Sequence, residues 1–158
     1  MPRYETMHRV AHSAEAMFDL VADVESYPQF VPLCERLVVR ARRDDGESQN
    51  LIVDMTIGYK VIRETFTSKV TLERPALVIR ADYLDGPFRV MENLWTFTPA
   101  GEGTSDIGFR IAYEFKSRAL ALLMGTMFDR VFRAFSTAFE KRADVVYGKA
   151  GPGREGKP

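Results

Sequence analysis

The fold of this chain depends on residues 117–147, which read SRALALLMGTMFDRVFRAFSTAFEKRADVVY. Large apolar residues recur there at gaps of three and four, which predicts one amphipathic α-helix. Ser117 is expected to cap its start and Gly148 to follow its end, which gives a length of roughly 45 Å. The apolar stripe comprises Leu120, Leu123, Met124, Met127, Phe128, Val131, Phe132, Phe135, Phe139 and Val146. The opposite face, expected in solvent, carries Arg118, Asp129, Arg130, Arg133, Thr137, Glu140, Lys141 and Asp144.

The residues before this helix supply an apolar surface for it to cover. Residues 3–10 alternate as a strand, and short helices are expected over 13–23 and 26–31. From there the apolar period changes from 3.6 to 2, which predicts six further strands. Short connections, such as Asp45-Gly46, favour antiparallel hairpins. The chain is therefore predicted to be α+β, with its long helix lying on the apolar face of an antiparallel sheet.

The composition is typical of one globular domain. The 158 residues include 22 basic and 22 acidic side chains, so the formal net charge is zero. This balance argues against DNA binding and against general nucleic-acid binding. The charged N-terminus lacks a signal-peptide pattern, and no apolar run approaches the roughly 20 residues of a membrane span. We expect a single domain over residues 1–148, a disordered tail over 149–158 and a cytoplasmic location.

The residues expected on the inner face of the sheet are largely apolar. The exceptions are Thr6, His8, Ser68, Asn93 and the hydroxyls of Tyr59, Tyr83 and Tyr113. Acid–base catalysis needs a positioned carboxylate, histidine or lysine, and only His8 is available there, without an evident carboxylate partner. We therefore expect no catalytic residues. Periodicity alone leaves open whether the interior is a filled core or a ligand cavity.

The remaining reactive side chains suggest no metal or nucleophilic site. Cys34, the single cysteine, is expected to be a small buried apolar residue. His12 is expected to be a solvated residue just before a helix. The sequence contains neither metal-ligand spacing nor a phosphate-binding glycine loop, so we expect no metal.

Four segments carry a resemblance to a known family: HRVAHSAEAMFDLVADVESYPQFVPLC, GYKVIRETFTSKV, DGPFRVMENLWTF and FRIAYEFKSRALALL. They resemble the coenzyme Q-binding family of START-like domains, within the polyketide cyclase/dehydrase and lipid-transport group. The resemblance extends from about Tyr4 to Gly148. It implies the helix-grip (START-like) fold, in which a curved seven-stranded antiparallel sheet wraps around a long C-terminal helix, with two short helices after the first strand. It also implies a tunnel between sheet and helix.

The resemblance implies a non-enzymatic carrier of a lipophilic small molecule. The implied ligand is ubiquinone, a polyprenyl quinone, with no required cofactor and a role in respiratory electron transfer. The expected ligand-binding residues are Tyr59, Phe66, Tyr83, Phe88, Met91, Asn93, Trp95, Phe109, Tyr113, Leu120, Leu123, Met124, Met127, Phe128 and Val131. A quinone carrier must collect its cargo from a bilayer, so we expect transient contact with the inner face of a membrane. The loop at Gly86-Pro87-Phe88 is the expected tunnel mouth, with an exposed aromatic ring touching lipid.

Two other functions stay open. Bacterial members of the same branch are assigned as toxins that block ribosomal subunit association, so the resemblance also implies a ribosomal subunit as a partner. Such a protein should carry a basic outer patch, but the overall charge balance favours an ordinary solvated face. The candidate patch comprises Arg36, Arg40, Arg42 and Arg43, with the back of the long helix as a second candidate. A polyketide cyclase-like enzyme is the third hypothesis, which the lack of acidic groups on the inner face disfavours.

Overall fold

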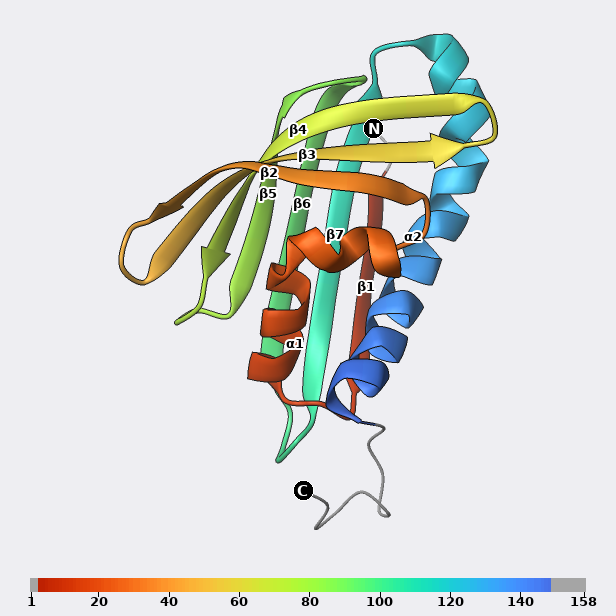
Figure 1. Ribbon diagram of the computed structural model, residues 1–158. Helices are drawn as coiled ribbons and strands as arrows, with labels where there is room; N and C mark the ends of the chain where they lie inside the picture. Colours follow the sequence, from red (N-terminus) through yellow and green to blue (C-terminus); the bar gives the residue numbers. More distant parts are fainter. Residues whose placement is uncertain (1–2, 149–158) are drawn as a thin grey trace.

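The computed structural model describes residues 3–148, apart from the side chains of residues 125–129 and 136. These residues form one seven-stranded sheet, two α-helices and one 3-10 helix (Figure 1). The elements in chain order are β1 (Arg3–Val10), α1 (Ala14–Ala22), η1 (Val24–Gln29), β2 (Cys34–Asp44), β3 (Ser48–Tyr59), β4 (Ile62–Glu73), β5 (Val78–Asp85), β6 (Phe88–Pro99), β7 (Ser105–Phe115) and α2 (Arg118–Tyr147). The expected tail, residues 149–158, lies outside the described residues.

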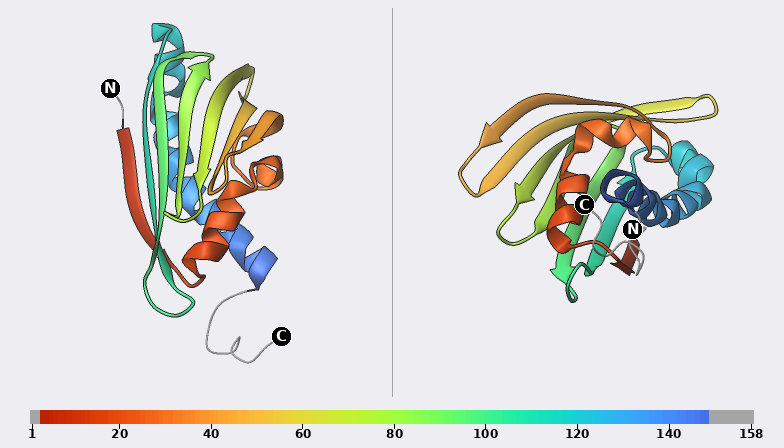
Figure 2. Two further views of the ribbon diagram at one scale, coloured as in Figure 1. Left: turned by 90° about the vertical axis from the view of Figure 1, so that its left-hand side faces the viewer. Right: turned by 60° about the horizontal axis from the view of Figure 1, so that its bottom comes forward.

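The sheet has the order β1-β7-β6-β5-β4-β3-β2, and all neighbouring strands run antiparallel. Strands β2 to β7 follow one another through short turns, whereas β1 crosses to the far edge and pairs with β7, with Tyr4 opposite Ile111. The sheet curves, and all the helices lie on its concave side (Figure 2). The predicted helix-grip arrangement is therefore confirmed.

Local capping chemistry sets the helix boundaries close to the predicted ones. The hydroxyl of Ser117 accepts a hydrogen bond from the Leu120 amide at 3.2 Å, and Gly148 ends α2 with a φ of 90°. Ser13 caps α1 in the same way, accepting from the Ala16 amide at 3.1 Å. None of the helices within residues 3–148 is long and apolar enough to cross a bilayer.

The second short helix differs from its prediction in position. It runs over Val24–Gln29, instead of over 26–31, and is a 3-10 helix. Pro28 lies inside it and has no amide hydrogen, so it cannot donate the backbone bond that an α-helix would need there. Proline also disfavours the α conformation for the residue before it, Tyr27.

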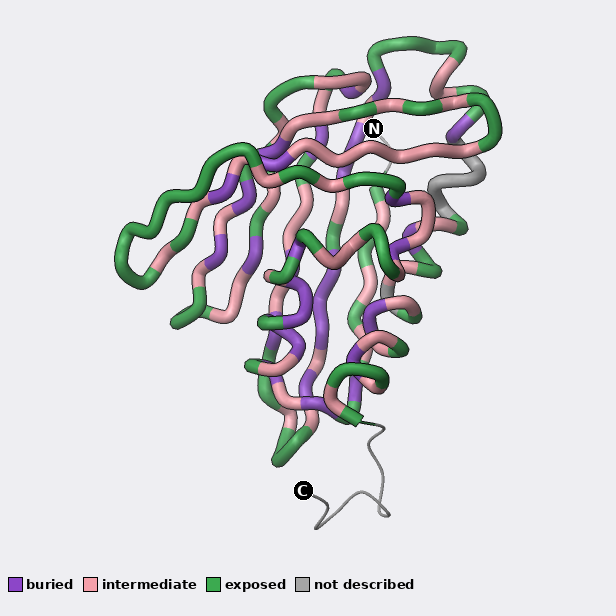
Figure 3. Tube along the Cα trace, in the orientation of Figure 1, coloured by how far each residue is buried: buried purple, intermediate pink, exposed green. Residues whose placement is uncertain are grey.

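The buried stripe of α2 is narrower than predicted. Met124, Phe132, Phe139 and Ala143 are buried, whereas Leu123 is 62% exposed and Val146 is 50% exposed. Figure 3 shows buried, half-buried and exposed segments following one another along α2. The prediction that Leu123 and Val146 face inward is therefore wrong. Successive helical residues are about 100° apart around the axis, so burial of Met124 turns its neighbour Leu123 toward solvent.

Two histidines fasten the C-terminal part of α2 to the segment around β1. The imidazole of His8 lies 2.7 Å from a Glu140 carboxylate oxygen, and that of His12 lies 2.7 Å from Asp144. Both contacts correct the sequence interpretation, because His8 has a carboxylate partner and His12 is buried instead of solvated. The polar face of α2 therefore includes two carboxylates that contact the domain rather than solvent alone.

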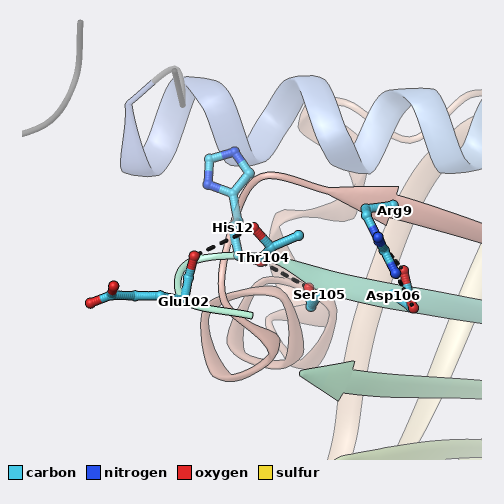
Figure 4. A network of polar contacts seen from close by, with 6 residues as sticks. All are labelled: Arg9, His12, Glu102, Thr104, Ser105 and Asp106. Atoms are coloured by element: carbon cyan, nitrogen blue, oxygen red, sulfur yellow. Dashed lines mark hydrogen bonds and ion pairs between the residues drawn. The ribbon is translucent and has the colours of Figure 1, made fainter. Parts of the chain in front are cut away.

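The segment that carries His12 is itself held in place. Figure 4 shows the His12 ring turned toward α2, while the buried Ser105 hydroxyl donates to the His12 carbonyl at 2.8 Å. Arg9 binds Asp106 through two hydrogen bonds of 2.8 and 3.1 Å across β1 and β7. These contacts hold the segment around His12 against the start of β7, so the His12 ring that binds Asp144 on α2 is fixed relative to the sheet.

Candidate functional site

A cavity of about 130 Å³ lies between the concave face of the sheet and the middle of α2. Strands β2 to β7 supply one wall. The facing wall comes from α2, through Val131, Phe132, Phe135 and Phe139. η1 and the loop after it close a third side with Val24, Tyr27, Val31, Pro32 and Leu33.

Aromatic rings from the sheet and from the η1 region pack around Phe139 on α2. The Phe139 ring lies at 5.0 Å from those of Trp95 and Phe30 and at 5.3 Å from that of Tyr27, all in edge-to-face contact. Phe109 extends this group toward the middle of α2, because its ring lies 6.0 Å from that of Phe135. Such pairs stabilise the fold beyond the area they bury, so this wall is both core and cavity lining.

The turn between β5 and β6 shapes another part of the cavity. Gly86 there has a φ of 144°, and a Cβ at this position would collide with Phe66 on β4. Only glycine allows this close approach. The approach brings the Phe88 ring to 5.5 Å from that of Phe66, and both rings line the cavity.

Seven of the fifteen expected ligand-binding residues line this cavity. They come from β4, β6, β7 and α2, and therefore from distant parts of the chain. They are Phe66, Phe88, Met91, Asn93, Trp95, Phe109 and Val131. Strand alternation predicted the inward direction of Phe66, Met91, Asn93, Trp95 and Phe109, because residues two apart on a strand share a face. Phe88 was expected to be exposed in the preceding loop, and the register shift between Phe88 and Val90 turns it inward.

The other expected residues lie elsewhere or are not described. The Tyr83 hydroxyl accepts from the Phe88 amide at 3.1 Å, and the Tyr59 ring lies 5.2 Å from the Lys60 ammonium. Leu123 is exposed. Six of the expected ligand-binding residues do not line the described cavity: Tyr59, Tyr83, Tyr113, Leu120, Leu123 and Met124. The side chains of Met127 and Phe128 lie outside the described residues.

Sequence reasoning missed the residues that loops bring to the cavity. Pro32 and Leu33 belong to the connection between η1 and β2, where Leu33 adopts a left-handed φ of 66° and its carbonyl accepts from the Gly58 amide at 3.0 Å. Left-handed backbone usually marks glycine or asparagine, so a leucine there leaves no signal in the sequence. Ser68, by contrast, could have been found, because alternation placed its small polar side chain on the inner face.

The cavity lining offers few polar groups. The Tyr27 hydroxyl donates to the Val21 carbonyl at 2.5 Å, and burial raises the pKa of this phenol. The Asn93 amide donates to the Arg110 carbonyl at 2.9 Å. The hydroxyl of Ser68 is buried and has no hydrogen-bond partner among the described residues.

The chemistry of this lining suits binding better than acid–base catalysis. Within the described residues, the lining contains no Asp, Glu, His, Lys or Arg. The carboxylate–histidine pairs of His8 and His12 lie outside it. Cys34 also lies outside it, and burial raises the pKa of its thiol to about 11, which keeps the thiol neutral at physiological pH.

Residues 10–140 match the family model described as polyketide cyclase / dehydrase and lipid transport. The chain belongs to this family. The predicted resemblance to coenzyme Q-binding proteins with a START-like fold is also confirmed.

Two relatives in the polyketide cyclase/dehydrase and lipid transport family carry different names. The ribosome association toxin RatA of Vibrio cholerae is 33% identical over 140 residues, which are 89% of this chain and 94% of the toxin. The mitochondrial coenzyme Q-binding protein COQ10 homolog B of Xenopus laevis is 32% identical over 150 residues, which are 92% of this chain and 59% of that protein.

Two solved structures confirm the fold of this family member. A START superfamily protein from Mycobacterium smegmatis has a TM-score of 0.77 and 21% identity, covering 91% of this chain and 98% of that one. The Zhui aromatase/cyclase from Streptomyces sp. R1128 has a TM-score of 0.77 and 17% identity, covering 94% and 99%. At these identities the likeness concerns the fold alone.

Proposed function

We propose that this protein binds and delivers a lipophilic molecule without acting as an enzyme. The ligand we propose is ubiquinone, delivered in support of respiratory electron transfer. The observation that carries the proposal is the cavity between sheet and α2, whose lining is apolar with few polar groups, as in most lipophilic-ligand pockets. The coenzyme Q-binding name of a 32% identical relative supports the choice of ligand.

The small size of the cavity sets a condition for binding a polyprenyl quinone. Pockets for drug-sized ligands have about 300–1,000 Å³, which is more than the 130 Å³ between sheet and α2. A polyprenyl quinone therefore requires the cavity to widen. Because Glu140 and Asp144 fasten the C-terminal end of α2, we expect the N-terminal half of α2 to move outward. Each buried CH₂-sized unit of the tail contributes about 0.8 kcal/mol toward this change.

Extraction of the purified protein tests the proposal. We expect protein made in a ubiquinone-producing bacterium to yield ubiquinone after organic extraction and mass spectrometry. We also expect the emptied protein to take ubiquinone from vesicles, read as quenching of Trp95, the single tryptophan of the chain, which lines the cavity. Folded protein that neither retains nor takes up a quinone contradicts the proposal.

Transient membrane contact from the cytoplasm is part of this proposal, at a different place from the one the sequence suggested. Phe88, the expected exposed aromatic, is 3% exposed. Exposed apolar side chains lie instead at the β3–β4 turn and in the first turns of α2: Val61 at 94%, Leu122 at 85% and Leu123 at 62%. We call these three residues the apolar end. The two segments lie at one end of the molecule in Figures 1 and 2.

The charges around the apolar end match an anionic bilayer. Lys60 precedes Val61 at the β3–β4 turn, and Lys116 and Arg118 flank the start of α2. Basic residues beside a membrane surface each contribute about 1 kcal/mol to binding of anionic lipid, and inserted leucines add apolar burial. The proposed partner is therefore a bilayer containing anionic phospholipid.

Replacing both Leu122 and Leu123 with aspartate is expected to weaken binding to phosphatidylcholine–phosphatidylglycerol vesicles by at least about tenfold, because two apolar contacts become charged and repulsive. Vesicle flotation measures the effect. The matched control replaces Val145 and Val146, which are 75% and 50% exposed at the other end of the same helix, with aspartate. Equal losses in both double variants, or no loss in the first, would rule out the apolar end as the docking surface.

A second candidate function is contact with a ribosomal subunit, and the match to the ribosome association toxin over 94% of its length favours it. The basic patch expected on β2 gives it little support, because neighbouring carboxylates partly neutralise the patch. The ion pairs are Arg40 with Asp54, Arg42 with Glu25 and Arg43 with Asp45. Co-sedimentation with isolated subunits at increasing salt separates the two functions, and absence of association at low salt removes this one.

A further inference from the structure

Ser68 stands out within the cavity because its buried hydroxyl has no hydrogen-bond partner among the described residues. It lies on β4, opposite Val53 on β3 and Tyr83 on β5, and is 3% exposed. β4 is paired with β3 on one side and with β5 on the other, and the β5 pairing is irregular between Thr67 and Ser68. The Ser68 hydroxyl instead lines the apolar space.

Such a hydroxyl is normally satisfied, because leaving it unpaired in an apolar interior is costly. A trapped water is a poor solution here. An ordered water needs roughly two to four polar partners, and besides Ser68 the described lining has only Tyr27 and Asn93 with hydroxyl or amide side chains, each already holding one hydrogen bond elsewhere. The remaining candidate partner is a polar atom of the ligand itself.

We propose that the Ser68 hydroxyl hydrogen-bonds an oxygen atom at the head of the bound ligand. This inference rests on the lipophilic-carrier function proposed above and specifies its ligand class: an apolar molecule with an oxygen at one end. A serine hydroxyl both donates and accepts. It therefore donates to a quinone carbonyl and accepts from the hydroxyl of the corresponding quinol, so Ser68 holds both redox states.

The position of Ser68 also orients the ligand. β4 lies inside the sheet, with β5 on one side and β3 on the other. Phe66 lies two residues away on the same strand and also lines the cavity. The head therefore lies against the sheet, and the tail faces Val131 and Phe132, which belong to the half of α2 that is expected to move outward.

The Ser68→Ala substitution tests this role through two opposite effects. The emptied protein should become more stable, with a Tm higher by about 2–4 °C, because an unpaired buried hydroxyl is removed. Affinity for ubiquinone, followed by Trp95 quenching, should fall by about three- to tenfold. Uptake of squalene, an isoprenoid hydrocarbon without oxygen, should stay unchanged when measured by extraction from loaded protein.

Ser105 provides the matched control, because it is equally buried but its hydroxyl is bonded to the His12 carbonyl. Ser105→Ala should lower the Tm and leave ubiquinone affinity unchanged. A lower Tm for Ser68→Ala, or equal ubiquinone affinity in Ser68→Ala and the unsubstituted protein, overturns this inference while the carrier function stands. Failure of the unsubstituted protein to bind ubiquinone at all overturns the carrier function itself.

Discussion

Replacing Ala81 with phenylalanine is expected to abolish ubiquinone loading while the protein stays folded. Ala81 lies on β5 and lines the cavity, so the added ring would occupy much of the 130 Å³ that the ligand head needs. We expect at least about a tenfold loss of affinity. Any overpacking by the added ring costs about 1–3 kcal/mol of stability, which a domain of this size withstands.

The same substitution at Ala41 is the control. Ala41 lies on β2 and is exposed, so Ala41→Phe adds a ring to the surface without entering the cavity. Quenching of Trp95 measures binding in both variants, and circular dichroism checks that each is folded. Undiminished binding by a folded Ala81→Phe variant would show that the ligand lies elsewhere and would remove the cavity from the proposed function.

The Phe139→Ala substitution is expected to produce the largest loss of stability, about 3–5 kcal/mol in the free energy of unfolding. Phe139 is 2% exposed and contacts Trp95 on the sheet, Tyr27 on η1 and Phe30 after it. Removal of its ring leaves a hole where α2, the sheet and η1 meet. Urea unfolding followed by circular dichroism measures the change.

Leu122→Ala on the same helix serves as the comparison. Leu122 is largely exposed, so this change should alter stability by no more than about 0.5 kcal/mol. A loss below about 1 kcal/mol for Phe139→Ala would mean that the region around α2 collapses to fill the hole. The aromatic wall would then be too compliant to hold a cavity between sheet and helix.

The fold was largely predictable because its signals are local. Alternation of apolar residues marked the strands, and Ser117 and Gly148 marked the ends of α2 through hydrogen bonds and backbone geometry within a few residues of each. The exception is η1, where Pro28 and a short length left helix type and boundaries poorly determined. Short helices depend on tertiary packing more than on propensity.

The candidate site was only partly predictable, because periodicity predicts to which face of the sheet a side chain points but not whether it lines the cavity. Alternation correctly turned Phe66, Met91 and Trp95 inward, and all three line the cavity. It also turned Tyr83 inward, whose hydroxyl instead accepts from the Phe88 amide. For α2, an assignment that differs by one residue rotates the face by about 100°, which is why Leu123 was misplaced.

The sequence by itself determined the order of the elements, the antiparallel pairing of β2 to β7 and the family. The element order and the pairing depend on residues close together in the chain, and the family depends on motifs along most of it. Only the tertiary structure decided that His12 is buried against Asp144, 132 residues away, and that Ser68 keeps an unpaired hydroxyl inside the cavity. Whether a buried polar group finds a partner depends on segments that meet only after folding, and this decided which side chains remain available for a ligand.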